Sequence, residues 1–447
     1  MSISTNEWKG INLPRSVAIL NIGTTLEWYD FVIAGTAAAL VWPYIFFPTS
    51  VPGVGLVLSF TVFGIGFLGR PIGSIVFGHI GDKIGRKTAL ILTLTLMGIA
   101  SLGVALVPGY DAIGFIAPVL ITIFRLLEGF GIGGEWGGAA TALVEYTANR
   151  KNRGFWTSWI QQGLQFGVIL GDGLGFILLA YFGLASFIAY AWRYLFYIGF
   201  AVSIVGAIFR YTFTETPIFK KMFEQKKVVK YPFIEMWKKD WKKVLIMVGI
   251  WLQISASFYI AITFSEAYIK VLGFSSSFAL MTVIIGAAAT IIVTLLAAML
   301  SDRVQSRKKI MLISPIFIIP YSFIFFILMD TRSAFLIVFA VAIYYAFELF
   351  GWSVVPTFYA EYSPPQYRYT ATAFSLNLST AISGGIAPII MSLILLFFKD
   401  HYLVAWPYLA LVGVAYSVIS LVALLFVKED TAKKDLSKTD EKDFDFI

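Results

Sequence analysis

The chain has 447 residues, of which 58% are apolar and only 13% are charged. Soluble domains average about 45–50% apolar and about 25% charged residues, so this composition excludes an ordinary soluble protein and a disordered chain. The lack of cysteine excludes disulfides, iron–sulfur clusters and thiol catalysis, and two histidines make a His-rich metal site implausible.

Apolar stretches long enough to cross a bilayer recur along the whole chain, since a membrane-spanning helix needs about 20 apolar residues. We expect them at 16–45, 55–80, 88–107, 113–146, 155–181, 188–212, 243–271, 278–301, 309–329, 333–360, 368–398 and 404–427. The sequence therefore predicts an all-α integral membrane protein with twelve transmembrane helices. We expect no cleavable signal peptide, because residues 16–45 are too long for its apolar core and contain two carboxylates.

The formal net charge of +8 is distributed in a regular way. If both termini are cytoplasmic, 28 of the 34 Lys and Arg residues lie in the termini, in the even-numbered connections or at the span ends next to them. This is the positive-inside pattern, which predicts a multi-pass plasma-membrane protein with cytoplasmic termini. The pattern also explains the basic charge without a nucleic-acid partner.

One long polar stretch divides the predicted spans into six and six. The sequence also repeats across this division: Asp82 follows the second span and Asp302 the eighth, while Glu145 ends the fourth span and Glu361 follows the tenth. Two matching offsets indicate a duplicated six-helix unit, which is typical of secondary transporters. We expect an N-terminal bundle at 1–212, a cytoplasmic loop at 213–242, a C-terminal bundle at 243–427 and a cytoplasmic tail at 428–447.

Several motifs carry a resemblance to a known family. The run Gly78-His-Ile-Gly-Asp82-Lys83-Ile-Gly85-Arg86-Lys87 resembles the loop between spans two and three of the major facilitator superfamily. Three further stretches resemble the metabolite:H⁺ symporters of that superfamily, which carry citrate, 2-oxoglutarate, shikimate, proline or betaine. They are Glu27-Trp-Tyr-Asp30-Phe, Phe67-Leu-Gly-Arg70-Pro-Ile-Gly and Arg125-Leu-Leu-Glu-Gly129 with Gly133-Gly-Glu135-Trp-Gly-Gly138. The resemblance implies two pseudo-symmetric six-helix bundles and a carrier rather than an enzyme, with no cofactor and no metal. In the second half, the Asp302 loop lacks the expected glycine and has one residue inserted.

Glycine-rich stretches in the spans predict helix packing. Two of them match G-x-G-x-x-G, but they lie inside continuous apolar helices with no preceding strand, which excludes a dinucleotide turn. Small residues at four-residue spacing let helix backbones approach closely, as at Gly163, Gly167, Gly171 and Gly175. Such a stripe serves either a sliding contact or static packing.

Charged residues inside the spans are the candidates for proton coupling, because an ionisable group at that depth is costly without a function. Asp30 lies at a depth similar to that of Arg125 and Glu128. Burial and a nearby guanidinium act on a carboxyl pKa in opposite directions, so a moving arginine could switch its protonation. We predict a proton-coupling device of Asp30, Arg125 and Glu128, with Glu27 and Glu135 added on the family signature. The alternative is a permanent ion pair that fixes two helices.

Two arginines are candidates for binding a carboxylate in two-point contact. Arg70 lies near the middle of span two, and Arg193 lies near the outer end of span six. The alternative is that they pair with Asp172, Glu27 or backbone carbonyls. Other polar residues expected at the substrate site are Tyr29, Gln161, Gln165, Asp172, Gln253, Glu348 and Asn377, whereas Glu266 and Lys270 are expected to pair with each other.

The repeated loops predict a gate at the cytoplasmic surface. The residues expected there are Gly78, Asp82, Gly85, Arg86, Lys87, Glu145, Arg153, Asp302, Glu361 and Arg368. Asp82 is expected to accept from Arg86 or Arg153 and to face a helix N-terminus of the other half. The alternative is that these charges only orient the chain.

Together these features predict a secondary active transporter, a proton-coupled symporter of a small organic carboxylate that works by alternating access. Its expected partners are the substrate, H⁺ and the lipid bilayer, and we expect a monomer. Two alternatives remain: an exporter, or a proton-coupled or facilitative carrier of a neutral or zwitterionic solute such as a sugar, proline or betaine. A membrane sensor is disfavoured because no signalling domain fits into the central loop or the tail.

Overall fold

The computed structural model describes residues 12–49, 53–212, 215–225, 228–398, 404–428, 430–434 and 436, and every regular element in these ranges is a helix. The long helices of the first half are α2 (Leu13–Leu40), α4 (Val54–Gly66), α5 (Gly69–Lys83), α6 (Arg86–Leu106), α8 (Ile116–Tyr146), α9 (Arg153–Ser186) and α10 (Arg193–Arg210). The second half has α12 (Pro232–Tyr259), α13 (Ser265–Val271), α14 (Ser276–Val304), α15 (Arg307–Asp330), α16 (Ala334–Trp352), α17 (Val355–Tyr362), α18 (Arg368–Ser383), α19 (Ile386–Phe397) and α20 (Trp406–Leu425). Short helices are α3 (Trp42–Ile45), α7 (Tyr110–Ile113) and α11 (Pro217–Glu224), and π-helical turns occur at Phe187–Ala191 and Ile260–Phe264.

The number of membrane-spanning helices agrees with the sequence pattern. Within the described residues, eleven helical stretches are long and apolar enough to cross a membrane. The twelfth long helix is α2, whose 28 residues extend about 42 Å at 1.5 Å per residue. Its hydropathy is lowered by polar residues, among them Glu27 and Asp30, that point into the protein rather than to lipid.

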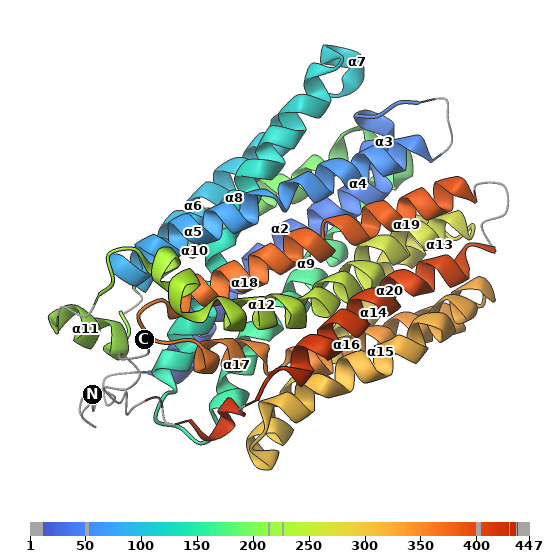
Figure 1. Ribbon diagram of the computed structural model, residues 1–447. Coiled ribbons are helices and arrows are strands. Elements are labelled where there is room, and N and C mark those ends of the chain that lie inside the picture. Colours follow the sequence, from blue (N-terminus) through green and yellow to red (C-terminus); the bar gives the residue numbers. More distant parts are fainter. Residues whose placement is uncertain are drawn as a thin grey trace.

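The long helices run side by side through one bundle (Figure 1). The two halves meet where α9 packs on α14, where α5 packs on α18 and where α4 packs on α19. One end of the bundle holds the starts of α2 and α9 and the residues 430–434, and we call it the terminal face. The opposite end holds α3, α7 and the end of α13 (Figure 1), and we call it the far face.

Two breaks between consecutive long helices occur beside glycine and proline. Between α4 and α5 the chain turns at Phe67 and Leu68, just before Pro71, whose missing N–H cannot bond the carbonyl four residues earlier. Arg70 therefore sits in the first turn after a break, where its buried side chain points into the bundle. A similar break at 384–385, two glycines ahead of Pro388, separates α18 from α19.

The glycine stripe of α9 lies against α2, as the spacing predicts. A Cβ atom on Gly163 would lie 2.3 Å from Oγ1 of Thr24, and one on Gly167 would lie 2.7 Å from Cβ of Trp28. Gly175 differs, because the nearest atom to its Cβ position is 3.7 Å away. Close backbone approach is therefore required in the first two turns of the stripe and not at its end.

The expected central loop at 213–242 contains more regular structure than its polarity predicts. α11 forms within it, and α12 begins at Pro232, ahead of the apolar stretch. The first turns of α12 are amphipathic and end at a kink, where Asp240 has φ −128° and ψ 25° and accepts a 2.6 Å hydrogen bond from Tyr367. Most of the expected tail at 428–447 lies outside the described residues.

Candidate functional site

Arg70 lies buried between the two halves, with 1% of its surface exposed. Its Nη2 is 3.2 Å from Oε1 of Glu27 on α2, and its Nε donates a 2.8 Å hydrogen bond to Oδ1 of Asn377 on α18. Asn377 is in turn held by the carbonyls of Gly133 and Ala373. Three of the residues predicted for proton or substrate binding thus meet at one point.

One edge of the Arg70 guanidinium is not engaged. Its Nη1 has no hydrogen-bond partner among the described residues, and neither has the hydroxyl of Tyr259 on α12, which lies near the guanidinium. Oε2 of Glu27 is likewise buried without a partner there. Buried polar atoms are nearly always hydrogen bonded. The unpaired atoms of this cluster can therefore form hydrogen bonds with a polar ligand or with water.

The proton-coupling candidates form a second cluster. Ser101 donates a 2.7 Å hydrogen bond to Oδ1 of Asp30, and Arg125 forms an ion pair with Glu128 on the same helix, three residues along. The carboxyl groups of Asp30 and Glu128 also face each other. Two carboxyl groups can hydrogen bond to each other only with a proton between them.

A single aromatic ring connects the two clusters. The guanidinium of Arg70 lies 4.8 Å from the centre of the Phe31 ring, and that of Arg125 lies 5.0 Å from it. A cation over an aromatic face within about 6 Å is attracted by the ring quadrupole. Since Phe31 follows Asp30 in α2, this ring contacts both guanidiniums directly beside the Asp30 carboxyl.

A column of aromatic side chains crosses between the halves at this level. Trp28 contacts Phe258 and Trp352 at ring-centre distances of 5.1 and 5.5 Å, while Trp251 contacts Trp136 and Trp352 at 5.2 Å each. The indole N–H groups of Trp28 and Trp352 have no hydrogen-bond partner in the described part of the chain. The column therefore joins the two halves by ring contacts and contains two indole donors without a partner among the described residues.

Gln161 stabilises this column from α9. Its Oε1 accepts from Nε1 of Trp136 at 2.9 Å, and its Nε2 donates to the carbonyl of Trp352 at 3.1 Å. Gln165, one turn further, donates only a long 3.5 Å bond to Thr294. Gln253 on α12 bonds Ser257 at 3.1 Å and Ser314 at 3.2 Å, so it belongs to a polar network within the second half.

Four predicted residues lie apart from these clusters. Glu135 forms an ion pair with Arg210 on α10 and accepts a 2.7 Å hydrogen bond from Thr93, and Tyr29 donates to the carbonyl of Leu195. Arg193 donates to three backbone carbonyls, those of Ala105, Val107 and Ala189, and so holds the far-face start of α10. Glu348 is fully buried on α16, and neither of its oxygens has a hydrogen-bond partner among the described residues.

At the terminal face, Asp82 joins the first half to the second. Its Oδ2 accepts from the backbone N–H of Thr370 at 2.9 Å and from its hydroxyl at 2.6 Å, in the first turn of α18. Gly78 allows this approach, because a Cβ there would lie 2.9 Å from Oγ1 of Thr370. Arg86 lies 3.1 Å from Asp82 and 3.3 Å from Glu145, which also contacts Arg368 at 3.4 Å.

The second half repeats this arrangement with the roles exchanged. Oδ1 and Oδ2 of Asp302 accept from the N–H groups of Gly154 and Phe155 in the first turn of α9, at 3.0 and 2.7 Å. Arg153, at the start of the same helix, lies 2.6 Å from Oε1 of Glu361 and not at Asp82. Each half therefore places one aspartate on a helix N-terminus of the other, where the helix dipole favours a negative charge.

Arg307 was not among the residues predicted for the gate, because its loop contains one inserted residue. It lies 2.7 Å from Asp302 and 3.4 Å from Glu361, the positions that Arg86 occupies in the first half. Gly85 has φ +143°, whereas the longer loop turns at Gln305 with φ +53°. The spacing from aspartate to arginine is four residues in the first half and five in the second. The sequence repeat therefore matched the two aspartates but did not match Arg307 to Arg86.

Other contacts at the terminal face are made with segments that carry no motif. Lys87 bonds the carbonyl of Tyr211 at 2.6 Å, and its N–H donates to Glu215 at 3.2 Å. Burial raises the pKa of the Glu215 carboxyl, which Arg86 and backbone N–H groups lower in part. Thr431, beyond the last span, donates a 2.6 Å hydrogen bond to Glu361.

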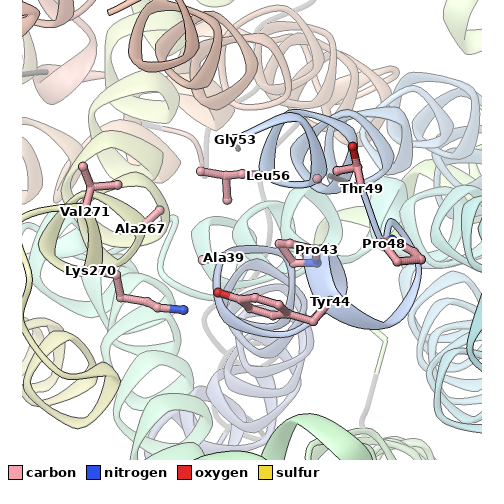
Figure 2. A pocket seen from close by; sticks show the side chains of 11 residues that line it. Ala39, Pro43, Tyr44, Pro48, Thr49, Gly53, Leu56, Ala267, Lys270 and Val271 are labelled. Atoms are coloured by element: carbon pink, nitrogen blue, oxygen red, sulfur yellow. The ribbon is translucent and has the colours of Figure 1, made fainter. Parts of the chain in front are cut away.

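A cavity of about 560 Å³ opens at the far face between the halves, lined by Ala39, Pro43, Tyr44, Pro48, Thr49, Gly53, Gly55, Leu56, Ala267, Lys270 and Val271. Figure 2 shows Lys270 reaching into it toward Tyr44, with its ammonium 5.4 Å from the centre of the Tyr44 ring. The expected pair between Lys270 and Glu266 is not among the ion pairs of the described residues. Glu266 faces inward instead, toward Thr36 and Asp172, because it lies on the buried side of α13.

Comparison with known proteins identifies the family. The Major Facilitator Superfamily profile matches residues 20–388. Three relatives are proteins of Escherichia coli K12. The inner membrane metabolite transport protein YhjE is 32% identical over 95% of this chain and 96% of its own length. The proline/betaine transporter is 30% identical over 83% of this chain and 76% of its own length, and the shikimate transporter is 29% identical over 91% of this chain and 92% of its own length. The structure of the proton:xylose symporter XylE bound to 6-bromo-6-deoxy-D-glucose superimposes with a TM-score of 0.75 at 19% identity, covering 95% of this chain and 98% of that one.

These matches confirm the predicted fold of twelve helices in two bundles and the resemblance to metabolite symporters. The superfamily consists of transporters, so the protein is not an enzyme. The chain belongs to the major facilitator superfamily and is a membrane transporter.

Proposed function

We propose that the protein carries a small organic carboxylate across the plasma membrane together with a proton. In this proposal the terminal face is cytoplasmic, in accord with the distribution of Lys and Arg, and the far face is outside. Arg70 receives the carboxylate through its unengaged edge, with Tyr259 beside it. The proton is held between Asp30 and Glu128 and is released when Arg125 shifts.

The observation that carries the proposal is the position of both guanidiniums over the single ring of Phe31. A substrate carboxylate at Arg70 neutralises that guanidinium and weakens its attraction to the ring and to Glu27. The ring and α2 can then relax toward Arg125, which changes the field at the shared proton. Substrate binding and proton binding are thereby linked through one side chain.

The closed terminal face and the cavity at the far face support alternating access. Bonds that exist in only one conformation bias the equilibrium between conformations. The two aspartate–helix contacts join the halves at the terminal face, and their loss would accompany opening on that side. The same substrate site would then face the cytoplasm.

A second candidate substrate is a zwitterion with a carboxylate and a quaternary or secondary ammonium. The aromatic column beside Arg70 favours it, because aromatic faces attract such cations. One relative is named as a proline/betaine transporter and another as a shikimate transporter, and the substrates in both names contain a carboxylate. The carboxylate is thus the feature common to both candidates.

A transport assay in liposomes tests the proposal. Purified protein is reconstituted, and uptake of small carboxylates, betaines and sugars is measured with and without an inward proton gradient. We expect accumulation of a carboxylate-bearing solute only with the gradient, and substrate-dependent proton entry. Uptake of sugars alone, or accumulation that is independent of pH, would refute the proposal.

Charge counting then separates the two candidates. One elementary charge moved across 100 mV is worth about 2.3 kcal/mol, and one pH unit about 1.36 kcal/mol per proton. A monocarboxylate with one proton moves no net charge, so its uptake should follow the pH gradient and ignore potential. A zwitterion with one proton moves one positive charge. Strong driving by an inside-negative potassium diffusion potential at equal pH would therefore favour the zwitterion.

A further inference from the structure

A second pair of buried carboxyl groups lies close to the far face and joins the two halves. Asp172 comes from α9 of the first half and Glu266 from α13 of the second, and both are fully buried. Thr36 of α2 lies between them, with its hydroxyl 2.7 Å from Oδ1 of Asp172 and 3.5 Å from Oε1 of Glu266. The hydroxyl has one hydrogen and gives it to the nearer oxygen.

The geometry at Thr36 favours a proton on the pair. The carboxyls of Asp172 and Glu266 face each other across the Thr36 hydroxyl, whose single hydrogen goes to Asp172, so Glu266 joins this group by a good hydrogen bond only when it carries a proton of its own. The other polar groups that face them are Lys270 of α13 and Tyr345 of α16, and Glu348 faces that tyrosine in turn. Within the described residues, no cation lies within ion-pair distance of either carboxyl, and Oδ2 of Asp172 and Oε2 of Glu266 have no hydrogen-bond partner.

Chain neighbours of this pair line the far-face cavity. Ala267, the neighbour of Glu266 in the chain, lines it, as does Ala39, one turn beyond Thr36 on α2 (Figure 2). The cavity therefore reaches residues that are close in the chain to Thr36 and Glu266, on the side of the pair that faces the far face. Two deprotonated carboxylates buried at low dielectric constant would repel each other strongly. They would then move apart or become hydrated.

We propose that Asp172 and Glu266 form a second proton site, whose proton holds the outer end of the two halves together. The proton binds from outside when the halves close and is released to the same side when they open. This inference rests on the proposed orientation of the carrier. It makes proton binding a condition for outer closure, separate from the proton at Asp30.

The linkage has a definite sign. The closed state binds a proton that the open state releases, so low external pH favours closure and high external pH favours opening. Across the titration, the ratio of open to closed molecules rises by up to about tenfold per pH unit. An amide at either position donates its own N–H to the remaining carboxylate, so closure then needs no proton.

Cysteine labelling tests this, because the chain contains no cysteine. Ala39→Cys serves as reporter in the cavity wall, and Phe115→Cys, whose phenylalanine is 74% exposed at the far face, corrects for the reactivity of the thiol itself. The ratio of their alkylation rates by an impermeant maleimide is measured in substrate-free proteoliposomes from about pH 5 to about pH 9. We expect it to rise with pH in the parent chain and to stay low and flat in Glu266→Gln.

Further variants keep the test decisive. Asp172→Asn should behave as Glu266→Gln, so the test survives if one of them fails to fold. Asp111→Asn, which removes an exposed carboxylate at the far face, should keep the parent profile. A parent ratio that does not change with pH, or amide variants that retain the rise, would overturn the proposal.

The same measurement is independent of the proposed function. Asp30→Asn should abolish proton-driven uptake and leave the labelling profile intact. A flat parent profile together with loss of uptake in Asp30→Asn would remove the outer proton site alone. A normal profile with proton-driven uptake retained in Asp30→Asn would instead remove the proposed role of Asp30.

Discussion

Replacing Asp82 by Asn should open the terminal face of the transporter. The carboxylate of Asp82 accepts two hydrogen bonds from Thr370, and these bonds cross between the halves. Its contact with Arg86 lies within the first half and does not contribute to closure. Asn keeps the shape of the side chain and removes the charge, so it isolates the electrostatic part of the contact.

The size of the effect follows from these contacts. A hydrogen bond to a charged group contributes about 1.5–3 kcal/mol and a neutral one about 0.5–1.5 kcal/mol, so each bond to Thr370 loses about 1 kcal/mol. The attraction of the charge to the start of α18 adds about 0.3–1 kcal/mol. The closed state should therefore lose about 2–3 kcal/mol, which shifts the equilibrium about 30- to 150-fold toward opening at this face.

A buried cysteine reports the opening. Thr157 on α9 contacts Thr357 of the other half and is fully buried, so Thr157→Cys should react with a maleimide only after the face opens. We expect its alkylation rate to rise in Asp82→Asn, while Ala39→Cys at the far face reacts more slowly. Asp302→Asn should act in the same direction, because Asp302 makes the symmetric contacts to α9.

The control is Glu235→Gln, which removes one charge from an exposed pair with Lys239 at 3.7 Å. Such exposed pairs contribute about 0–1 kcal/mol, so this variant should label like the parent chain. If Asp82→Asn labels no faster than Glu235→Gln, the contact between Asp82 and α18 does not hold the terminal face closed.

Three further predictions concern the membrane interior. Asp30→Asn should lose uphill uptake driven by a pH gradient and keep part of its substrate exchange; normal accumulation in liposomes would contradict a proton site there. Arg70→Lys cannot reproduce a two-point contact and should weaken substrate binding by about 1–3 kcal/mol in an equilibrium binding assay, whereas unchanged affinity in a folded variant would make Arg70 structural. Gly167→Ala should lower the Tm in detergent, because its Cβ would lie 2.7 Å from Cβ of Trp28 and overpacking costs about 1–3 kcal/mol; Gly175→Ala, which meets no atom closer than 3.7 Å, is the control, and equal Tm values would contradict this packing argument.

The sequence alone determined the features that depend on local composition. The spans, the helical class and the duplicated half follow from hydropathy and from short repeats, because a bilayer imposes the same requirement on each helix wherever it lies in the chain. The motif residues of the terminal face were also found from a local pattern, the repeat of short motifs in the two halves. Asp82 and Asp302 each follow a span at matching offsets, so the spacing of the sequence was sufficient.

The tertiary structure decided which buried groups meet. Arg70 bonds Asn377, 307 residues away, and the equally buried Glu135 pairs with Arg210 rather than joining the cluster of Asp30, Arg125 and Glu128. Glu266 and Lys270 are one helical turn apart, yet Glu266 faces Asp172 in the other half. Sequence spacing determines which side chains share a helix face. What that face contacts depends on how each helix is rotated about its axis and on which helices lie beside it. Those depend on packing across the whole bundle, and no local pattern contains that information.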